Sequence, residues 1–481
     1  MTGVSSFDAI VIGSGPNGLA AAITLQQAGV SVLLIEGKNT IGGGLRTEQL
    51  TLPGFHHDVC SAVHPLAIAS PFFNTLPLEK FGLKYIHPAI PAAHPFDDGT
   101  AAIASRALNE TSHLLGEDEH TYTKLLSPVI EAWPQLAGDL LGPLSFPSRP
   151  LSFARFGQNA MLPASSLVRR FKTSHARGLW AGMAAHSIQP LTNLASSAIG
   201  IVLLAAAHMK GWPIPKGGSK SIADALAGYF QSIGGVIQTG SFVKSIRDLP
   251  TAKAFFFDVT PVQLLKIAGE EFSSFYTHQL KRYRYGMGVF KLDWALDQPI
   301  PFTASEARQA GTVHIGGTFE EIQSTEAQSS KGTHPEKPFV LLAQPSVFDS
   351  SRAPAGKHTA WAYCHVPNGS SKDMTSVIEG QVERFAPGFR ETILSRHSMT
   401  TIQLEQYNPN YVGGDINGGI IDIRQLFTRP ALRVSPYKTS AKGIYICSSS
   451  TPPGGGVHGM CGFHAARRGL RDIFGITIEK P

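Results

Sequence analysis

A glycine-rich turn between an apolar strand and a helix, near the N-terminus, restricts the fold more than any other feature of the chain. The elements come in the order strand Phe7–Ile12, motif Gly13-Ser14-Gly15-Pro16-Asn17-Gly18, helical segment to Gly29, strand Ser31–Ile35 and then Glu36. Both strands are apolar and β-branched, as strands buried on both faces are. This order is typical of a βαβ dinucleotide-binding unit and not of an ordinary glycine turn.

The residues of the motif have separate physical roles. Gly13 permits the tight turn, Gly15 lets the backbone approach a pyrophosphate, and Gly18 lets the helix pack close to the strand. The helix then presents its partial positive charge to the phosphates, with Pro16 and Asn17 in its first turn. Glu36 stands about 20 residues further on, where a carboxylate accepts hydrogen bonds from ribose hydroxyls.

The segment after Glu36 favours FAD over NAD as the dinucleotide. It contains a glycine run and then an arginine with a small polar residue. This pattern resembles the second FAD motif of the two-dinucleotide-binding-domain flavoproteins. The resemblance implies cofactor contacts at Gly37, Gly43, Gly44 and Arg46.

Two later segments resemble further parts of an FAD site. Gly443–Cys447 reads as a strand, and a glycine-rich loop and a helix follow it. In the flavoproteins that it resembles, such a loop covers the flavin ring, which implies contacts at Ser449, Gly455, Gly456 and Val457. Ser448 and Ser449 stand where many members have a carboxylate. Gly235–Ile246 resembles the strand pair that holds the adenine, around Val243.

Taken together, the chain resembles the phytoene desaturase-like flavoprotein family. Pro53–Pro65, Gly211–Leu226 and Asn408–Gly419 favour the branch with the desaturase-type carotenoid ketolases and the pyridine nucleotide-disulfide oxidoreductase domain-containing 2 proteins. The resemblance implies an α/β fold, with a Rossmann-like FAD-binding domain and a mixed α+β substrate domain. It also implies FAD as cofactor.

The positions of the motifs predict a discontinuous FAD-binding domain, built from residues 1–75, 211–290 and 430–481. The substrate domain is expected to combine a mainly helical cap, residues 76–210, with a strand-rich part, residues 291–429. Within the latter, the polar stretch Glu321–Lys337 is expected to form a surface loop.

The cysteines do not fit the disulfide chemistry in the name of that branch. A disulfide reductase needs a redox-active cysteine pair, but the four cysteines form neither a CxxC nor a CxxxxC pattern and show no zinc-ligand spacing. No second dinucleotide motif follows a strand. We therefore expect no metal, no second Rossmann domain for a nicotinamide cofactor, and a reducing, cytoplasmic location.

Charge excludes a nucleic-acid partner. The 41 basic and 35 acidic residues give a net charge of +6, without a run of basic residues. A mild attraction to anionic lipid surfaces, and so peripheral membrane contact, stays open. The oligomeric state is also open.

The candidate acid–base residues are histidines, because imidazole titrates near neutral pH. His458 follows the flavin-covering glycines directly. His64 and His57 lie in the segment after the glycine run. Further candidates are Asp58, His464, the pocket-closing motif with Tyr407, Asn410, Tyr411 and Asp415, and Cys461 as a covalent flavin attachment point. Each has a structural alternative, and for Cys461 that is a buried thiol.

The resemblance implies an enzyme, namely an FAD-dependent oxidoreductase of the desaturase or dehydrogenase type. Hydride would pass from a lipophilic, isoprenoid or polyene-like substrate to the flavin, with oxygen or a quinone as electron acceptor. Leu194–Met209, with Phe146, Phe153 and Phe156, could line an apolar channel or belong to the core. The alternatives are an amine-oxidase-like oxidase, a flavin-dependent double-bond isomerase and a flavin-binding scaffold without turnover.

Overall fold

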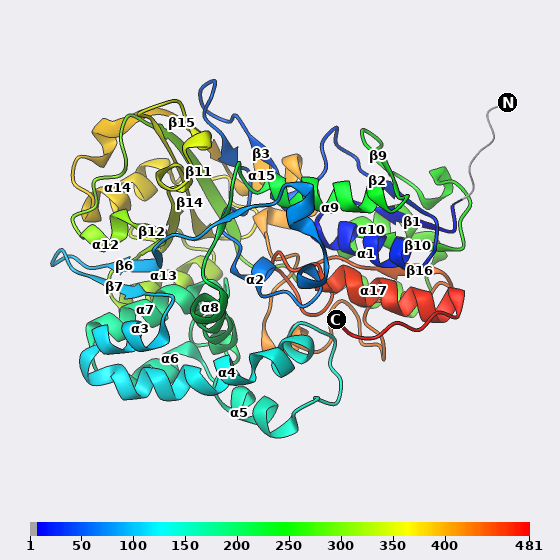
Figure 1. Ribbon diagram of the computed structural model, residues 1–481, viewed down its shortest axis with the longest axis horizontal. Coiled ribbons are helices and arrows are strands. Elements are labelled where there is room, and N and C mark those ends of the chain that lie inside the picture. The colour runs from blue at the N-terminus through cyan, green and yellow to red at the C-terminus, as the bar shows by residue number, and fades with distance from the viewer. Residues whose placement is uncertain (1–6) are drawn as a thin grey trace.

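The structure is a computed structural model that describes residues 7–481. Two sheets organise it, and Figure 1 shows them side by side, with a group of helices below the larger one. The smaller sheet is parallel and has five strands. In spatial order they are β16 (Ile444–Ile446), β10 (Ala254–Phe257), β1 (Ala9–Ile12), β2 (Val32–Ile35) and β9 (Val236–Gln238).

Helices cover both faces of this parallel sheet, which is why its strands are apolar throughout. Ala9 and Val11 of β1 face one layer of helices, whereas Ile10 and Ile12 face the other. The first layer contains α1 (Pro16–Gln27), α9 (Lys220–Ser232) and α17 (Met460–Gly469). The second layer contains α10 (Pro261–Ala268) and α11 (Ser274–Lys281). This three-layer arrangement confirms the predicted Rossmann-like fold.

The larger sheet has seven strands and is antiparallel except where β12 pairs with β6. The spatial order is β15 (Ile393–Met399), β11 (Gly288–Leu296), β14 (His358–Val366), β13 (Val340–Ala343), β12 (Ala310–Ile315), β6 (Ile90–Pro95) and β7 (Ala101–Ala104). Three of the strands are long continuous segments of the expected strand-rich part. The two strands β6 and β7 at one edge come instead from the segment expected to be mainly helical.

The two faces of the larger sheet pack against different helices. One face packs against α12 (Ser305–Arg308) and α14 (Thr375–Phe385). The other contacts the helical group below the sheet in Figure 1. That group contains α3 (Leu108–Leu114), α4 (Glu119–Leu140), α5 (Pro150–Ala160), α6 (Ala164–Leu167), α7 (Ser174–Ala185), α8 (Ser196–Lys210) and α13 (Phe319–Ser330).

Short elements connect the two sheets. They are β3 (Thr47–Glu48) with β4 (His57–Asp58), β5 (Tyr85–Ile86) with β8 (Ile214–Pro215), and the helices α2 (Pro65–Ile68), α15 (Thr401–Tyr407) and α16 (Ile423–Leu426). No helix within residues 7–481 combines the length and the apolar character needed to cross a bilayer. The proposed division into three FAD-binding segments and two substrate-domain segments stays a prediction.

Two local predictions are wrong. The stretch Glu321–Lys337 is not a loop over its first half, because α13 extends to Ser330. Thr318 and Glu321 form a capping box that satisfies backbone amides at the start of this helix. Residues 235–246 do not form the predicted strand pair. They contain one strand, β9, and the chain after it bonds to the end of β2, where Ser241 N lies 2.9 Å from Glu36 O.

Candidate functional site

A cavity of about 780 Å³ is lined by residues from both sheets. At one end it contacts the carboxyl ends of β1, β2 and β10, where parallel sheets bind ligands. At the other end it contacts β12, β13, β14, the helix α8 and the segment directly after α7. Its volume lies in the range of small-molecule and cofactor sites. We call these the dinucleotide end and the substrate end.

The glycine motif forms the turn at the dinucleotide end. Gly13 has a φ of +98°, which favours glycine, and its amide bonds Ile35 O at 2.8 Å. A Cβ at Gly18 would lie only 1.9 Å from Gly13 O, so this glycine permits the close approach of α1 to β1. The first turn of α1 starts at Pro16, and Gly15, Pro16 and Asn17 line the cavity.

Asp258 was not predicted as a site residue. It follows β10, lines the cavity, and accepts a 2.9 Å hydrogen bond from Gly18 N at the start of α1. Burial raises the pKa of this carboxyl to about 7, against the Gly18 bond, and Glu36 adds to the rise. The sequence signal was present, since an acid after the apolar strand Ala254–Phe257 repeats the pattern of Glu36 after Val32–Ile35.

Glu36 is fixed by a network at the end of β2. Its carboxylate accepts hydrogen bonds from Ser14 Oγ at 2.5 Å and Lys38 N at 2.9 Å. Arg46 lies 3.2 Å from the same carboxylate and also donates to the carbonyl of Thr40. Both side chains line the cavity, so the charges of the glutamate and the arginine are oriented there before a ligand binds.

All of the residues predicted to contact the cofactor line the cavity except Gly18, whose amide donates to Asp258. The lining set is Gly13, Gly15, Pro16, Asn17, Glu36, Gly37, Gly43, Gly44, Arg46, Val243, Ser449, Gly455, Gly456 and Val457. Two glycines permit close packing of these segments, because a Cβ at Gly43 would lie 2.9 Å from Gly15 Cα and one at Gly455 would lie 2.8 Å from Asn417 Oδ1. The chain segments that carry these residues therefore meet at one site.

The substrate end is apolar and aromatic. Leu341, Trp361 and Tyr363 contribute from the larger sheet, and Ile199 and Leu203 from α8. Of the described residues that line the cavity, the acidic ones are Glu36 and Asp258, both at the dinucleotide end. The substrate end therefore offers no carboxylate to a cationic ligand.

His64 is the one predicted catalytic histidine that lines the cavity. Its Nε2 lies 2.7 Å from Ser219 Oγ, whose own proton is directed to Ser61 O at 2.6 Å. His64 Nε2 is therefore the donor to the serine. Burial lowers the pKa of the His64 ring to about 4, so the ring is neutral at pH 7.

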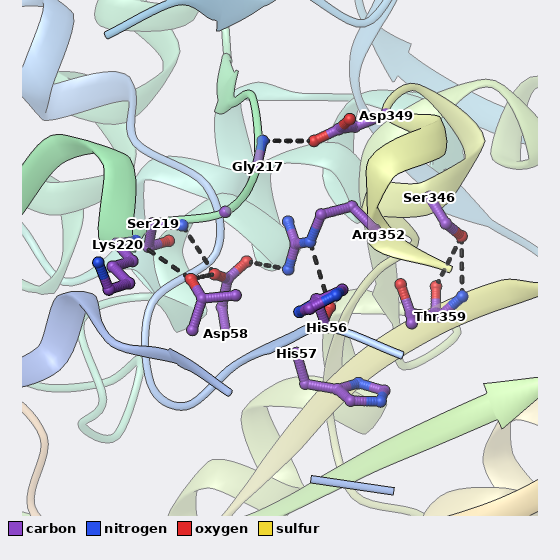
Figure 2. Close-up of polar contacts among 12 residues, drawn as sticks. His56, His57, Asp58, Gly217, Ser219, Lys220, Ser346, Asp349, Arg352 and Thr359 are labelled. Carbon is purple, nitrogen blue, oxygen red and sulfur yellow. Dashed lines mark hydrogen bonds and ion pairs between the residues drawn. The ribbon is translucent and has the colours of Figure 1, made fainter. Parts of the chain in front are cut away.

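His57 does not line the cavity. Its Nε2 bonds Thr51 Oγ1 at 2.8 Å, and its Nδ1 lies 3.6 Å from Asp293 Oδ1. Burial lowers the pKa of this ring to about 4, even though Asp293 acts in the opposite direction. In Figure 2 the side chain of His57 points away from its neighbour Asp58.

Asp58 anchors the segment that carries these two histidines. Arg352 contacts its carboxylate at 2.8 Å, and both side chains are buried (Figure 2). Thr47 Oγ1 and Ser219 N donate to the other oxygen at 2.7 and 2.8 Å. Asp58 therefore joins three chain segments and is a positioning group, not a group exposed to a ligand.

His458 and His464 also lie outside the cavity lining. Met460 N donates to His458 Nδ1 at 3.0 Å, so this ring caps the start of α17. Burial lowers the pKa of His458 to about 4 and that of His464 to about 3. The predicted ranking of catalytic candidates is thus corrected: His64 lines the cavity, and His458, expected to be the best placed, supports a helix.

Some of the remaining candidates line the cavity and others do not. Cys461 directs its Sγ to Thr451 O at 3.5 Å, outside the cavity lining, and burial raises the pKa of its thiol to about 11. Tyr407, Asn410 and Tyr411 line the cavity. Asp415 does not, because it accepts hydrogen bonds from the amides of a turn, Gly286 N and Asn417 N, both at 2.7 Å.

The three phenylalanines expected near a channel are not part of the cavity lining. Phe146 is 87% exposed, whereas Phe156 packs in the core between α4 and α5. Phe153 is half-buried. Of the apolar stretch 194–209, Ile199 and Leu203 reach the cavity and the other large apolar residues of α8 are core. Residues 7–481 contain no cluster of three metal-ligating side chains.

His186 is a cavity residue that the sequence did not reveal. It follows the last residue of α7, and its Nε2 lies 2.8 Å from Nε2 of His314 on β12. The two residues are 128 positions apart. No local motif marks them, and only the fold brings them together.

Comparison with known proteins agrees with this geometry. Residues 11–74 match the NAD(P)-binding Rossmann-like domain family. Over almost the full length, the chain is similar to the rat (Rattus norvegicus) pyridine nucleotide-disulfide oxidoreductase domain-containing protein 2, at 26% identity, covering 97% of this chain and 94% of the relative. It is also similar to one of the subunits of limonene dehydrogenase from Castellaniella defragrans, at 22% identity, covering 99% and 97%.

Solved structures show the same fold. An oxidoreductase from Methanosarcina mazei superposes with a TM-score of 0.66 at 16% identity, covering 96% of this chain and 99% of the other. A putrescine oxidase triple mutant, from a redesign of cofactor binding, gives a TM-score of 0.62 at 14% identity, covering 98% and 99%. The chain therefore has the fold of these oxidoreductases, with a Rossmann-like dinucleotide-binding domain.

The cysteines bear on the word "disulfide" in the name of the rat relative. All four lie within the described residues and are free thiols, three buried and Cys60 half-buried. Burial raises the pKa of each thiol. A raised thiol pKa disfavours the thiolate that disulfide exchange requires.

Proposed function

We propose that the protein is an FAD-dependent oxidoreductase that takes hydride from a C–H bond of a lipophilic substrate, as a desaturase, dehydrogenase or oxidase. The observation that carries this proposal is the single cavity that joins a dinucleotide site to an apolar pocket. A dinucleotide cofactor that extends along such a cavity places its reactive end next to the substrate.

FAD fits the residues of the dinucleotide end. The start of α1 suits the pyrophosphate, and Glu36 suits the ribose. Beyond them, the glycine run at Gly43 and the loop at Gly455 also line the cavity. FAD supplies the hydride acceptor. The protein residues bind and orient it, and they exclude water from the reacting bond.

A neutral, lipophilic substrate fits the other end. Its walls are apolar and aromatic, with all lining carboxylates at the dinucleotide end. The similarity to a limonene dehydrogenase over 99% of this chain also favours an isoprenoid substrate. The placement beside the desaturase-type ketolases is part of this proposal.

The reoxidation partner that we propose is oxygen or a quinone. The glycine-rich segment 311–317 leads from β12 into α13, but the next strand, β13, pairs antiparallel with β12, so this segment does not form a second βαβ unit. The segment 413–419 begins within a short 3₁₀ turn and contains no longer helix. A quinone would require peripheral contact with a membrane, toward which the net charge of +6 gives a mild attraction.

A second candidate is amine oxidation, since the fold is shared with a putrescine oxidase and aromatic residues, Trp361 and Tyr363 among them, line the substrate end. Trp361 and Tyr363, however, contact one another edge to face at 5.3 Å, so no ligand fits between these two rings. The lack of a carboxylate at this end also disfavours a diamine. We therefore rank amine oxidation below oxidation of a neutral substrate.

Anaerobic mixing of the FAD-loaded protein tests the proposal. We expect the flavin absorbance to persist with NADH and NADPH and to bleach with an oxidisable isoprenoid. Rapid bleaching by a nicotinamide would contradict substrate oxidation as the primary half-reaction. Bleaching by putrescine or cyclohexylamine, but by no isoprenoid, would favour the second candidate.

A further inference from the structure

His186 brings a polar ring to the apolar end of the cavity. Its Nε2 is paired with His314, and its Nδ1 has no hydrogen-bond partner among residues 7–481. This nitrogen is not among the sealed, unpartnered atoms of the interior, and the residue lines the cavity. His186 Nδ1 is therefore open to a ligand.

The pairing with His314 determines which nitrogen of His186 carries the proton. Burial lowers the pKa of both rings, that of His186 to about 3, so both are neutral at pH 7. In the 2.8 Å contact, one Nε2 must donate and the other must accept.

His314 has little choice about its role. Its Nδ1 is buried without a partner against the backbone of Gly182, where a Cβ would lie only 2.6 Å away. A buried N–H without an acceptor is more costly than a bare ring nitrogen. His314 thus carries its proton on Nε2 and donates to His186, which leaves the proton of His186 on Nδ1, facing the cavity.

Thr312 supplies a second donor beside this one. It lies two residues before His314 on β12, so both side chains project from the same face of the strand. Trp212 Nε1 donates to Thr312 Oγ1 at 2.8 Å, which leaves the hydroxyl proton of the threonine free for another acceptor. Trp212 and Thr312 line the cavity, and the rings of Trp212 and His186 lie 6.0 Å apart.

The other histidines around the pair, and the glutamate that pairs with one of them, do not reach the cavity. His94 on β6 bonds Gly317 O at 2.6 Å, and His365 on β14 is paired at 2.8 Å with Glu326 on α13. All three are buried and outside the lining. Within this cluster, only His186 presents a ring N–H to a ligand, and the walls beside it are Ile188, Leu203 and Leu341.

We infer that His186 Nδ1–H and the Thr312 hydroxyl bind one oxygen atom, a carbonyl or a hydroxyl, of an otherwise apolar substrate. This narrows the proposed substrate class from hydrocarbons to mono-oxygenated lipophiles such as isoprenoid alcohols and ketones. His186 is then a specificity-determining residue, and His314 is a positioning residue that fixes its tautomer. The inference rests on the proposed function for the place of the reaction.

Equilibrium titration with matched pairs tests this inference. The probes are geraniol against 2,6-dimethylocta-2,6-diene and carvone against limonene, each pair differing by one oxygen function. Binding is followed by the fluorescence of the cavity tryptophans Trp212 and Trp361, with and without FAD. We expect the oxygenated member of a pair to bind about five- to ten-fold more tightly, the effect of one or two neutral hydrogen bonds.

Variants separate recognition from folding. In H186F the ratio of affinities for the oxygenated and the hydrocarbon probe is expected to fall close to one. H186N keeps an amide donor near the position of Nδ1 and is expected to retain part of the preference. H314F is expected to lower the preference, and H314Q, whose amide still donates to His186, to restore it. H94Q is the matched control, because His94 is equally buried but does not line the cavity.

Three outcomes would overturn the inference. They are equal affinities within every pair for the wild-type protein, a preference that survives H186F, and failure of every probe to bind a protein that binds FAD normally. Failure to bind FAD would instead contradict the proposed function. The tryptophan signal of the FAD-free protein would then still decide whether His186 recognises oxygen.

Discussion

The two ends of the cavity are built in different ways. The dinucleotide end takes much of its lining from residues 12–46, and its polar groups include the ion pair of Glu36 and Arg46 and the titrating carboxyl of Asp258. The substrate end takes one or two residues each from the end of α7, from α8 and from three strands of the larger sheet. Two of its polar groups, His186 and Thr312, are neutral and are oriented by hydrogen bonds to His314 and Trp212.

This difference separates the part of the cavity suited to binding a cofactor from the part suited to selecting a substrate. A phosphate-rich cofactor requires fixed charges and helix amides, which a short motif can supply. A lipophilic substrate requires shape and one or two donors, which only the assembled fold supplies. We therefore expect the dinucleotide end to determine the class of cofactor and the substrate end to determine the substrate.

The Asp58–Arg352 pair tests whether the two ends share one support. In R352M the buried Asp58 keeps Thr47 and Ser219 as partners but loses its counter-charge. We expect a loss of about 3–5 kcal/mol in the free energy of unfolding, measured by urea denaturation. D58N combined with R352M should recover part of it.

The matched control for this prediction is R177M, which removes a partly exposed ion pair with Glu320 and should cost at most about 1 kcal/mol. A loss for R352M as small as that of the control would show that the ends are supported independently. A large loss in which binding at both ends weakens together would confirm the common support.

Gly18 tests the dinucleotide end alone. In G18A the new Cβ would lie 1.9 Å from Gly13 O, so α1 must move away from β1. We expect a loss of about 1–3 kcal/mol in stability, and weaker FAD binding measured by fluorescence titration. G157A serves as the control, since a Cβ there meets nothing within 4 Å. Tight FAD binding by G18A would refute the assigned role of the turn.

Asp258 gives an expected effect that appears as a pH dependence, and only the dinucleotide end should show it. Its pKa of about 7 lies above the ordinary aspartate value of 3.8, so the native state binds the extra proton between these values. The contribution of Asp258 to the free energy of unfolding is therefore fully present below pH 3.8 and is lost as the pH rises to about 7.

A bound phosphate favours the protonated form of Asp258. FAD affinity should thus fall above pH 7, by up to about ten-fold per pH unit. D258N should give a flat profile, while D224N, a change on the exposed face of α9, should keep the slope. Isothermal titration calorimetry in two buffers measures the proton uptake directly. An identical profile for D258N and the wild type would exclude Asp258 as the titrating group.

The sequence predicted the dinucleotide end well because its signals are local. The glycine motif, the flanking apolar runs and Glu36 predicted β1, α1 and β2 to within a few residues. Two signals of the same kind were missed. Asp258 follows an apolar strand as Glu36 does, and Thr318 with Glu321 forms the capping box that starts α13.

The substrate end could not be predicted in this way. The role of His186 depends on His314, 128 residues away, and that of Thr312 on Trp212, 100 residues away. Proximity to a motif was also misleading, because His458 follows the glycine-rich loop 454–456 yet caps α17. Residue type and sequence position alone do not show which nitrogen of a buried histidine faces a cavity.

The most direct test of the account is a competition between dinucleotides for the purified protein. The matched family model describes an NAD(P)-binding Rossmann-like domain, whereas we propose that the site holds FAD. We predict one FAD per chain, bound with at least about 100-fold higher affinity than NAD⁺ or NADP⁺, and retained on gel filtration. Tighter binding of NAD⁺ or NADP⁺, with FAD excluded, would contradict the central claim.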